Sequence, residues 1–423
     1  MTCEIAIMNR YAIALAADSA TTVTYYVGTE AKERYFKGAN KIFQLSSHRP
    51  VGIMIFGTAT LHEVPWELIV KEFRRHLHDR SFNELEGYAS ELFDFIRGHD
   101  RLFPTEYQEK VFREEAHKIA FFDLFAAQQD AAVSQAADKT AAYRDFFAKR
   151  LAEIEAKPLH DGFVRDELDA ALARHKTALE GDLQQLVKSF QVEAHVDRAQ
   201  LAELAIRTLL TDPAEFMAST GVVIAGFADH DYFPRYVEYA CSAIILGKVI
   251  STQRELKGVS RDTPAHIKAF AMTDMVNTFQ VGVSPDVHRA AYTKWRKSLR
   301  ALAEEISKRV PAGAVGDVDA LIETVFDKHT RQWFTDAWEA HTVPLLRVVG
   351  SLPIDEMADL AETLIELQSL KEKVTKPTES VGGPIDVAVI SKSDGFIWIK
   401  RKQYFEAALN PRFFQRQAGE SQS

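Results

Sequence analysis

The sequence has few of the features that would point to a secreted or membrane protein. Only two cysteines occur in 423 residues, Cys3 and Cys241, so a disulfide framework does not account for stability. No apolar run approaches the length that spans a bilayer. Arg10 interrupts the early apolar stretch where a signal peptide needs an unbroken one. These absences predict a protein of a reducing compartment, and we expect the cytoplasm.

An excess of positive charge is also missing. The formal net charge is −9 at pH 7, whereas binding to nucleic acids or anionic membranes needs a basic surface. No glycine-rich loop of the P-loop or dinucleotide-binding type is present. We therefore expect neither nucleic acid nor a membrane as a partner.

Strand-like segments occur in three parts of the chain, and two long helical stretches separate them. Alternating or β-rich runs predict strands in the following segments: Cys3–Met8, Tyr11–Asp18, Lys41–Leu45, Val51–Phe56, Gly221–Phe227, Tyr236–Val249 and the final VGGPIDVAVISKSDGFIWIK. Helical spacing predicts helices in these segments: Leu61–His76, Asn83–Ile96, 105–214, 284–349 and Asp355–Val374. This order indicates a layered α+β architecture with sheets inside and helices outside.

The same pattern divides the chain into a core and two insertions. We predict that the core consists of 2–104, 216–283 and 351–411. Residues 105–215 and 284–350, which have few strand signals, are predicted helical insertions. The polar residues 412–423 are predicted to form a flexible tail.

Thr2 is the first candidate for chemistry. A methionine before a small residue is the context in which the initiator is normally removed, and removal would leave Thr2 with a free α-amine. That amine, with an unperturbed pKa of about 8, is a base next to the threonine hydroxyl. A single residue then supplies both nucleophile and base. An ordinary strand start explains the same residue.

Asp18 is the second candidate. Four apolar residues of the predicted N-terminal hairpin are odd-numbered: Ile5, Ile7, Ile13 and Leu15. A register that keeps them on one face pairs odd with odd residues and places Thr2 and Asp18 on the opposite face, at the same end. A turn aspartate before Ser19 is the alternative interpretation.

Several runs, which follow one another along the chain in the family's order, resemble parts of proteasome β subunits and the related bacterial protease subunits. Counted from Thr2, Asp18 stands where that family has its catalytic acidic residue, and KIFQL from Lys41 is similar to the strand that opens with the catalytic lysine. GIMIFGTAT is similar to the next strand, whose glycine here is Gly57. GGPIDVAVISKSDGFIWI resembles the last hairpin of archaeal-type β subunits, and VVIAGFADHDYFPRYVEYACSA resembles the central hairpin. The resemblance covers about half of the chain.

The resemblance implies a fold, a reaction and a role for each matched residue. The implied fold is the four-layer αββα sandwich of N-terminal-nucleophile hydrolases, here with helical insertions. The Thr2 hydroxyl would attack a peptide or amide carbonyl, and Lys41 would favour its alkoxide form as a nearby cation. Asp18 would hold Lys41, and the Gly57 N–H would bind the oxyanion. The resemblance implies no metal and no organic cofactor. It does imply that the chain forms a homo-oligomer.

The sequence departs from the family in the groups that support the terminal amine. The family has an aspartate and a serine three residues apart before the final glycine pair, where this chain has Thr378 and Val381. Ser380, beside Glu379, would substitute after a small shift. Thr273 aligns loosely with a further family serine.

Two alternatives to a peptidase remain open. One keeps the fold and nucleophile and changes the substrate to a small-molecule amide. The other is a catalytically inactive scaffold or ring subunit, which the missing aspartate–serine pair favours. Cys3 is a further candidate nucleophile if Thr2 were also removed, but the spacing to Asp18 favours Thr2.

Overall fold

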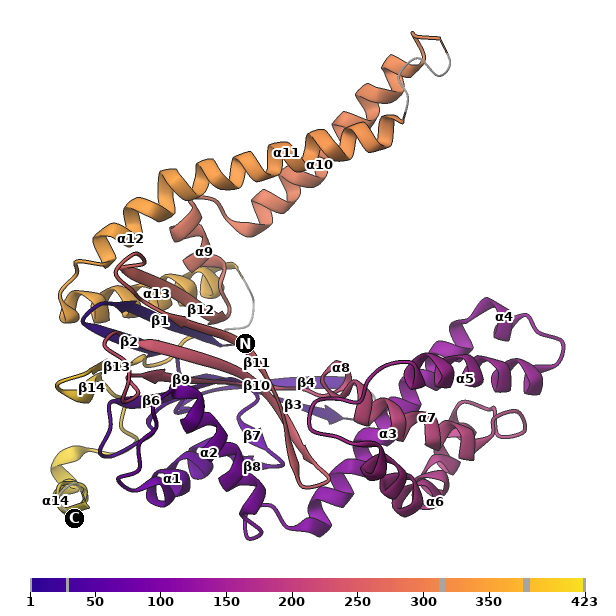
Figure 1. Ribbon diagram of the computed structural model, residues 1–423, viewed down its shortest axis with the longest axis horizontal. Helices are drawn as coiled ribbons and strands as arrows, with labels where there is room; N and C mark the ends of the chain where they lie inside the picture. Colours follow the sequence, from indigo (N-terminus) through magenta and orange to yellow (C-terminus); the bar gives the residue numbers. More distant parts are fainter. Residues whose placement is uncertain (1, 28–29, 312–316, 376–380, 421–423) are drawn as a thin grey trace.

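The computed structural model describes residues 2–27, 30–311, 317–375 and 381–420 and shows a mixed helix and sheet fold (Figure 1). Two five-stranded antiparallel sheets form its centre. Among the helices described, none is both long and apolar enough to cross a membrane.

The first sheet combines strands from the N-terminal and the C-terminal parts of the predicted core. Its strands, in spatial order, are β12 (Ala265–Ala271), β1 (Cys3–Asn9), β2 (Ala12–Ala17), β13 (Asp386–Ser391) and β14 (Gly395–Lys400). The hairpin β1–β2 lies at the centre, because β12 pairs with β1 and β13 pairs with β2. The N-terminal strand is therefore held on both sides.

The second sheet is built from the middle of the chain. Its strands, in spatial order, are β11 (Lys248–Gly258), β10 (Arg235–Ile245), β9 (Thr220–Gly226), β6 (Val51–Gly57) and β5 (Ile42–Gln44). The segment Tyr236–Val249, predicted as one strand, contains the turn at Leu246 and Gly247, both at positive φ, that joins β10 to β11.

The two sheets face each other across an apolar layer. Met8, Ile13 and Leu15 of the first sheet pack there with Met54 and Val223 of the second. Each sheet buries its other face against helices, so neither is open to solvent over its centre.

Helices cover the outer faces of both sheets. The second sheet packs against α1 (Trp66–Leu77) and α2 (Leu85–Gly98), and the first against α9 (Asp274–Val281), α12 (Val343–Val349) and α13 (Ile354–Thr375). Figure 1 shows α13 against the first sheet and α1 and α2 beneath the second. Strands from different parts of the sequence are thereby enclosed in one core.

The register of the β1–β2 hairpin differs from the predicted one. Ile5 pairs with Ala16, so odd residues lie opposite even residues. Ile5 faces the helices, whereas Ile13 and Leu15 face the second sheet, and the predicted single apolar face is wrong. Because both faces of these strands are buried, apolar residues occupy both, and residue parity does not identify the register.

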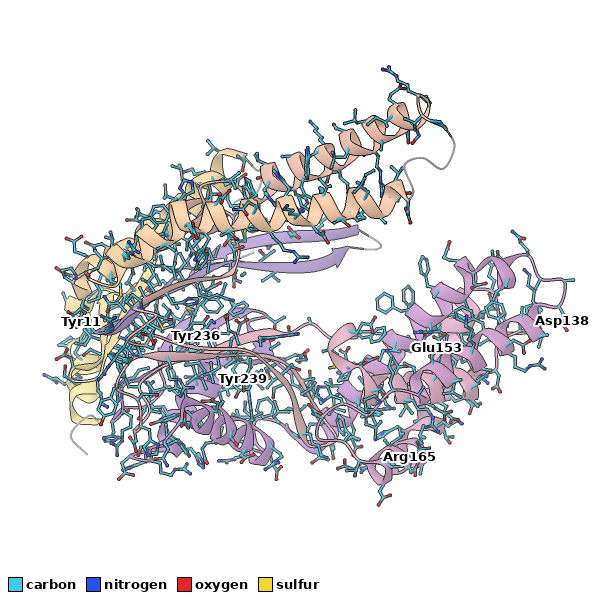
Figure 2. All side chains as sticks on the ribbon, turned by 45° about the horizontal axis from the view of Figure 1, so that its top comes forward. Tyr11, Asp138, Glu153, Arg165, Tyr236 and Tyr239 are labelled. Atoms are coloured by element: carbon cyan, nitrogen blue, oxygen red, sulfur yellow. The ribbon has the colours of Figure 1, made fainter. Side chains whose placement is uncertain are left out.

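The helices between residues 105 and 216 form a lobe with its own apolar core. They are α3 (Thr105–Gln129), α4 (Ala131–Ser134), α5 (Lys139–Glu155), α6 (Arg165–Ser189), α7 (Arg198–Thr211) and α8 (Pro213–Phe216). Ala243, Ile245 and Ile250 at the β10–β11 turn join this core. In Figure 2, Asp138, Glu153 and Arg165 lie on the lobe, away from Tyr236 in the sheets.

A second helical segment extends as an arm. Helices α10 (Pro285–Ser307) and α11 (Val318–Ala337) run side by side away from the sheets, and a π-helical turn, Trp338–Thr342, leads from α11 to α12 (Figure 1). No residue of α10 is buried. The arm therefore contributes little to the core.

The remaining elements are short or were not predicted. The strands β3 (Ala20–Val27) and β4 (Glu30–Lys37) form a separate hairpin, as do β7 (Thr60–Leu61) and β8 (Val64–Pro65), which occupy the start of the predicted helix Leu61–His76. A 3₁₀ turn at Ala407–Leu409 precedes α14 (Pro411–Glu420). Residues 412–420 are therefore helical here, whereas the sequence predicts a flexible tail from residue 412.

Gly226 gives a test of how tightly the second sheet is packed. Its φ is +137°, and an added Cβ would lie 2.0 Å from the carbonyl oxygen of Pro50. We expect Gly226→Ala to lower the free energy of unfolding by about 3 kcal/mol, measured by chemical denaturation. The control is Gly181→Ala in α6, where the new Cβ meets open space and the expected change is a gain of about 0.5–1 kcal/mol. Equal stability of the two variants would contradict the strain at Gly226.

Candidate active site

Three strand ends bring the predicted catalytic residues together. Thr2 stands immediately before β1, Asp18 immediately after β2, and Lys41 immediately before β5 of the other sheet. Their exposed fractions are 8%, 1% and 6%. The cluster is therefore buried where corresponding ends of the two sheets meet.

Asp18 holds Lys41 and is itself held by the backbone. The Lys41 Nζ lies 2.5 Å from Asp18 Oδ1, which also accepts the N–H of Cys3 at 3.1 Å. Asp18 Oδ2 accepts the N–H groups of Ala20 at 3.2 Å and Gly382 at 2.9 Å. Four donors fix the orientation of this carboxylate, and through it the position of the ammonium.

Glu4 is part of the cluster although it was not among the predicted site residues. The Thr2 hydroxyl donates a hydrogen bond to Glu4 Oε2 at 3.2 Å, and Lys41 Nζ lies 3.1 Å from Glu4 Oε1. Glu4 is completely buried. The cluster therefore contains two carboxyl groups and one ammonium.

The sequence contains a signal for Glu4. It is the one charged residue in the apolar run of β1, CEIAIM, and a charged side chain in a buried strand needs a partner. It lies two residues from Thr2, and residues two apart share a strand face. Thr2 and Glu4 therefore both face the second sheet, from which Lys41 comes.

Burial and the neighbouring charges together shift the pKa values of Glu4 and Lys41. Burial raises the pKa of Glu4, the Lys41 ammonium lowers it, and Asp18 raises it further, which gives a pKa of about 7. Burial alone would lower the pKa of Lys41, but Glu4 and Asp18 outweigh it and raise that pKa above 10.5. Lys41 is thus an ammonium at neutral pH, whereas Glu4 titrates there.

Gly57 lies at the end of β6, close in the ladder to Lys41. The N–H of Ile55, two residues earlier, donates to the Lys41 carbonyl oxygen at 2.8 Å. Gly57 is exposed and has a φ of +83°, and an added Cβ would lie 2.9 Å from the Ser219 carbonyl oxygen. The backbone therefore requires glycine at this position.

The other predicted residues are placed less closely. Thr273 precedes α9, and the N–H of its neighbour Met272 donates to the Thr2 carbonyl oxygen at 3.0 Å. The Thr273 hydroxyl itself accepts from Asn277 Nδ2 at 3.0 Å, and within the described ranges it has no hydrogen bond to Thr2 or Lys41. Ser380 lies outside the described residues, as does Thr378.

Cys3 is poorly placed to be the nucleophile. It is fully buried and packs among the apolar residues under α13, on the face away from Lys41. Burial, together with the nearby Glu4 and Asp18 carboxylates, raises the pKa of its thiol well above 9.0. A thiol of this kind is inert.

Comparisons with known proteins add little to this geometry. No family model matches the chain, and no curated protein matches it. Among solved structures, the chain is similar to an Anbu (Gly-1) mutant from Hyphomicrobium sp. strain MC1, with 10% identity and a TM-score of 0.26 over 99% of this chain and 97% of that chain. A TM-score of 0.26 supports no inference about the site, which is interpreted from its own geometry.

The raised pKa of Glu4 predicts a pH-dependent stability. Between pH 4.5, the ordinary value, and about 7, folded Glu4 keeps a proton that the unfolded chain has released. The stabilisation is full below 4.5 and is lost as the pH rises through about 7. Relative to Glu4→Gln, the wild-type free energy of unfolding should fall across this window, by on the order of 3 kcal/mol in total. Urea denaturation at several pH values checks this, and parallel curves for the two proteins would contradict it.

Proposed function

We propose that this chain is a hydrolase of the N-terminal-nucleophile class, with the four-layer αββα arrangement of that class. More specifically, we propose a proteasome-like threonine hydrolase in which removal of Met1 exposes Thr2, whose hydroxyl attacks a peptide or amide carbonyl. The observation that supports this best is the buried cluster in which Thr2, Lys41 and Asp18 meet from three separate strand ends.

Each residue of the cluster has a chemical task in this proposal. The Lys41 ammonium, 2.5 Å from Asp18, provides positive charge that stabilises the Thr2 oxygen as it becomes nucleophilic. Asp18, held by three backbone N–H groups, prevents Lys41 from turning away. The Gly57 N–H donates to the oxyanion of the tetrahedral intermediate. Water then hydrolyses the acyl-enzyme.

One observation favours a second candidate function, an inactive scaffold subunit. Val381 is apolar and 1% exposed, and it occupies the position where the resembled family has a serine. A chain without that serine would keep the fold and lose support for the terminal amine. Covalent labelling of Thr2 by a threonine-directed electrophile separates the two candidates, because a scaffold gives no labelling.

The proposal requires a free amine on Thr2. We expect the intact mass of the natively expressed protein to lack Met1. The measurement is intact-protein mass spectrometry, with a tryptic digest that locates the first residue. A mature chain that retains Met1 would contradict the assignment of Thr2 as an N-terminal nucleophile.

Lys41 should be required for the reactivity of Thr2. We expect Lys41→Ala to lower the rate of labelling about 100-fold or more, because a preorganised charge next to the reacting oxygen is lost. Loss of this ammonium also leaves Glu4 and Asp18 buried without their partner, so thermal unfolding is measured in parallel. The control is Lys71→Ala, on the exposed face of α1, where Lys71 pairs with Glu67.

Lys41→Arg keeps the charge and gives a second test. It should retain part of the labelling rate, because the guanidinium remains a cation between the two carboxylates. Labelling of folded Lys41→Ala at the wild-type rate would contradict the role of Lys41.

We also propose that the chain forms homo-oligomers through its arm. Leu302 and Ile306 on α10, and Leu321 and Val325 on α11, are 43–57% exposed. Exposed apolar residues on an extended helical pair are typical of a surface that packs on another subunit. Light scattering at micromolar concentration should give a mass above that of the monomer, and Leu302→Asp with Ile306→Asp should reduce it. A monomeric wild type would contradict assembly without affecting the proposal for Thr2.

A further inference from the structure

The proposed mechanism gives Glu4 no role, although this residue contacts Thr2 directly. The donor is the nucleophilic hydroxyl itself, and the acceptor is a carboxylate oxygen 3.2 Å away. The second oxygen of Glu4 is held by Lys41 at 3.1 Å. The carboxylate is thus oriented so that one oxygen faces the ammonium and the other faces the hydroxyl proton.

We infer that Glu4 is the general base of this site, which accepts the proton of the Thr2 hydroxyl and returns it to the leaving amine. The inference rests on the proposed function and names a catalytic residue for it. Glu4 qualifies as catalytic because it contacts the reacting oxygen directly. Asp18, which does not contact Thr2 by hydrogen bond among the described residues, remains a positioning residue for Lys41.

The proton movements balance over the reaction. As the bond from Thr2 Oγ1 to the carbonyl carbon forms, the hydroxyl proton passes to Glu4 Oε2. When the carbon–nitrogen bond breaks, the same proton passes to the leaving nitrogen, and the amine departs. In the second half a water gives a proton to Glu4 as it attacks the acyl carbon. That proton returns to Thr2 Oγ1 when the ester bond breaks.

Neither of the other charged side chains in the cluster suits this task, and the α-amine that removal of Met1 would give Thr2 is the competing base that the temperature measurement below distinguishes. Lys41 is an ammonium at neutral pH because two carboxylates raise its pKa, so it has no lone pair with which to accept a proton. Asp18 already accepts four hydrogen bonds, three from the backbone and one from Lys41. Glu4 has the free capacity and the direct contact.

The surroundings of Glu4 define its titration. The charged groups that face it are Lys41, before β5, and Asp18, after β2, and the proposed removal of Met1 would add the α-amine of Thr2. Its neighbours across the ladders, Phe270 in β12 and Ala17 in β2, carry no charge. A base with a pKa of about 7 is matched to a reaction near neutral pH, since proton acceptance is then efficient and the base is available.

The experiment measures the rate at which a threonine-directed electrophile labels Thr2 across the pH range, with Thr2→Ala as the zero reference. For the wild type we expect the rate to rise with pH and level off above an inflection near 7. Glu4→Gln keeps the shape and a hydrogen-bond acceptor but cannot take the proton. It should label about 100-fold more slowly, and the inflection near 7 should disappear. Glu4→Asp should keep the inflection at an intermediate rate.

Asp123→Asn is the matched control. Asp123 is also a buried carboxyl with a raised pKa, of about 6, and pairs with Arg150 in the helical lobe. This variant should label like the wild type. A similar loss of rate in Asp123→Asn would show that removal of any buried carboxyl causes the effect, and would overturn the assignment of Glu4.

A measurement on the wild type alone covers the case in which Glu4→Gln does not fold. The ionisation enthalpy of a carboxyl group is close to zero, whereas that of an amine is large. An inflection that stays near pH 7 as the labelling is repeated at higher temperature therefore identifies a carboxyl base. An inflection that moves to lower pH on warming identifies the terminal amine and overturns the inference.

The outcomes separate this inference from the proposed function. A wild type that is labelled at Thr2, together with a folded Glu4→Gln variant that keeps both rate and inflection, overturns the role of Glu4 alone. A wild type that is not labelled at Thr2 overturns the proposed function and the inference with it. Loss of rate and inflection in Glu4→Gln, with Glu4→Asp and Asp123→Asn behaving as described, supports both.

Discussion

The buried ammonium of Lys41 is the constraint on which the arrangement of both sheets depends. A charge removed from water is costly unless opposite charges and hydrogen bonds replace its hydration, and Lys41 obtains these from Glu4 and Asp18. Lys41 directly precedes a strand of the second sheet, whereas Glu4 lies in a strand of the first sheet and Asp18 directly follows one. Any shift of one sheet relative to the other would separate them, so the ion pairs fix the alignment of the sheets at this end.

The sequence predicted those parts of the fold in which local chemistry decides the outcome. The β13–β14 hairpin follows from two β-rich runs around Asp394-Gly395, and Gly395 has the positive φ that such a turn needs. The β3–β4 hairpin was missed although Ala20–Val27 is rich in β-branched and aromatic residues. The β1–β2 register was wrong because it is set by helices and a second sheet far away in the sequence.

The candidate site divides in the same way. Thr2, Asp18 and Lys41 were singled out by spacing and resemblance, and the structure brings them together, while their roles stay predictions. Glu4 was missed because an isolated carboxylate in a strand has no meaning until its partners are known. Its partner Lys41 comes from another sheet, and this pairing exists only in the tertiary structure. Residues 376–380, which include the predicted Ser380, lie outside the part of the chain that the structure describes.

The two carboxyl groups of the cluster have unequal surroundings. A single ammonium lies between Glu4 and Asp18, so the cluster has an excess of negative charge when both are ionised. Three backbone N–H groups compensate Asp18, whereas Glu4 has only Lys41 and the Thr2 hydroxyl among the described residues. Burial, with the Asp18 charge, raises the pKa of Glu4 to about 7, so this carboxyl beside the hydroxyl takes up a proton near neutral pH. In the proposed mechanism Asp18 positions Lys41, and Glu4 exchanges a proton with Thr2.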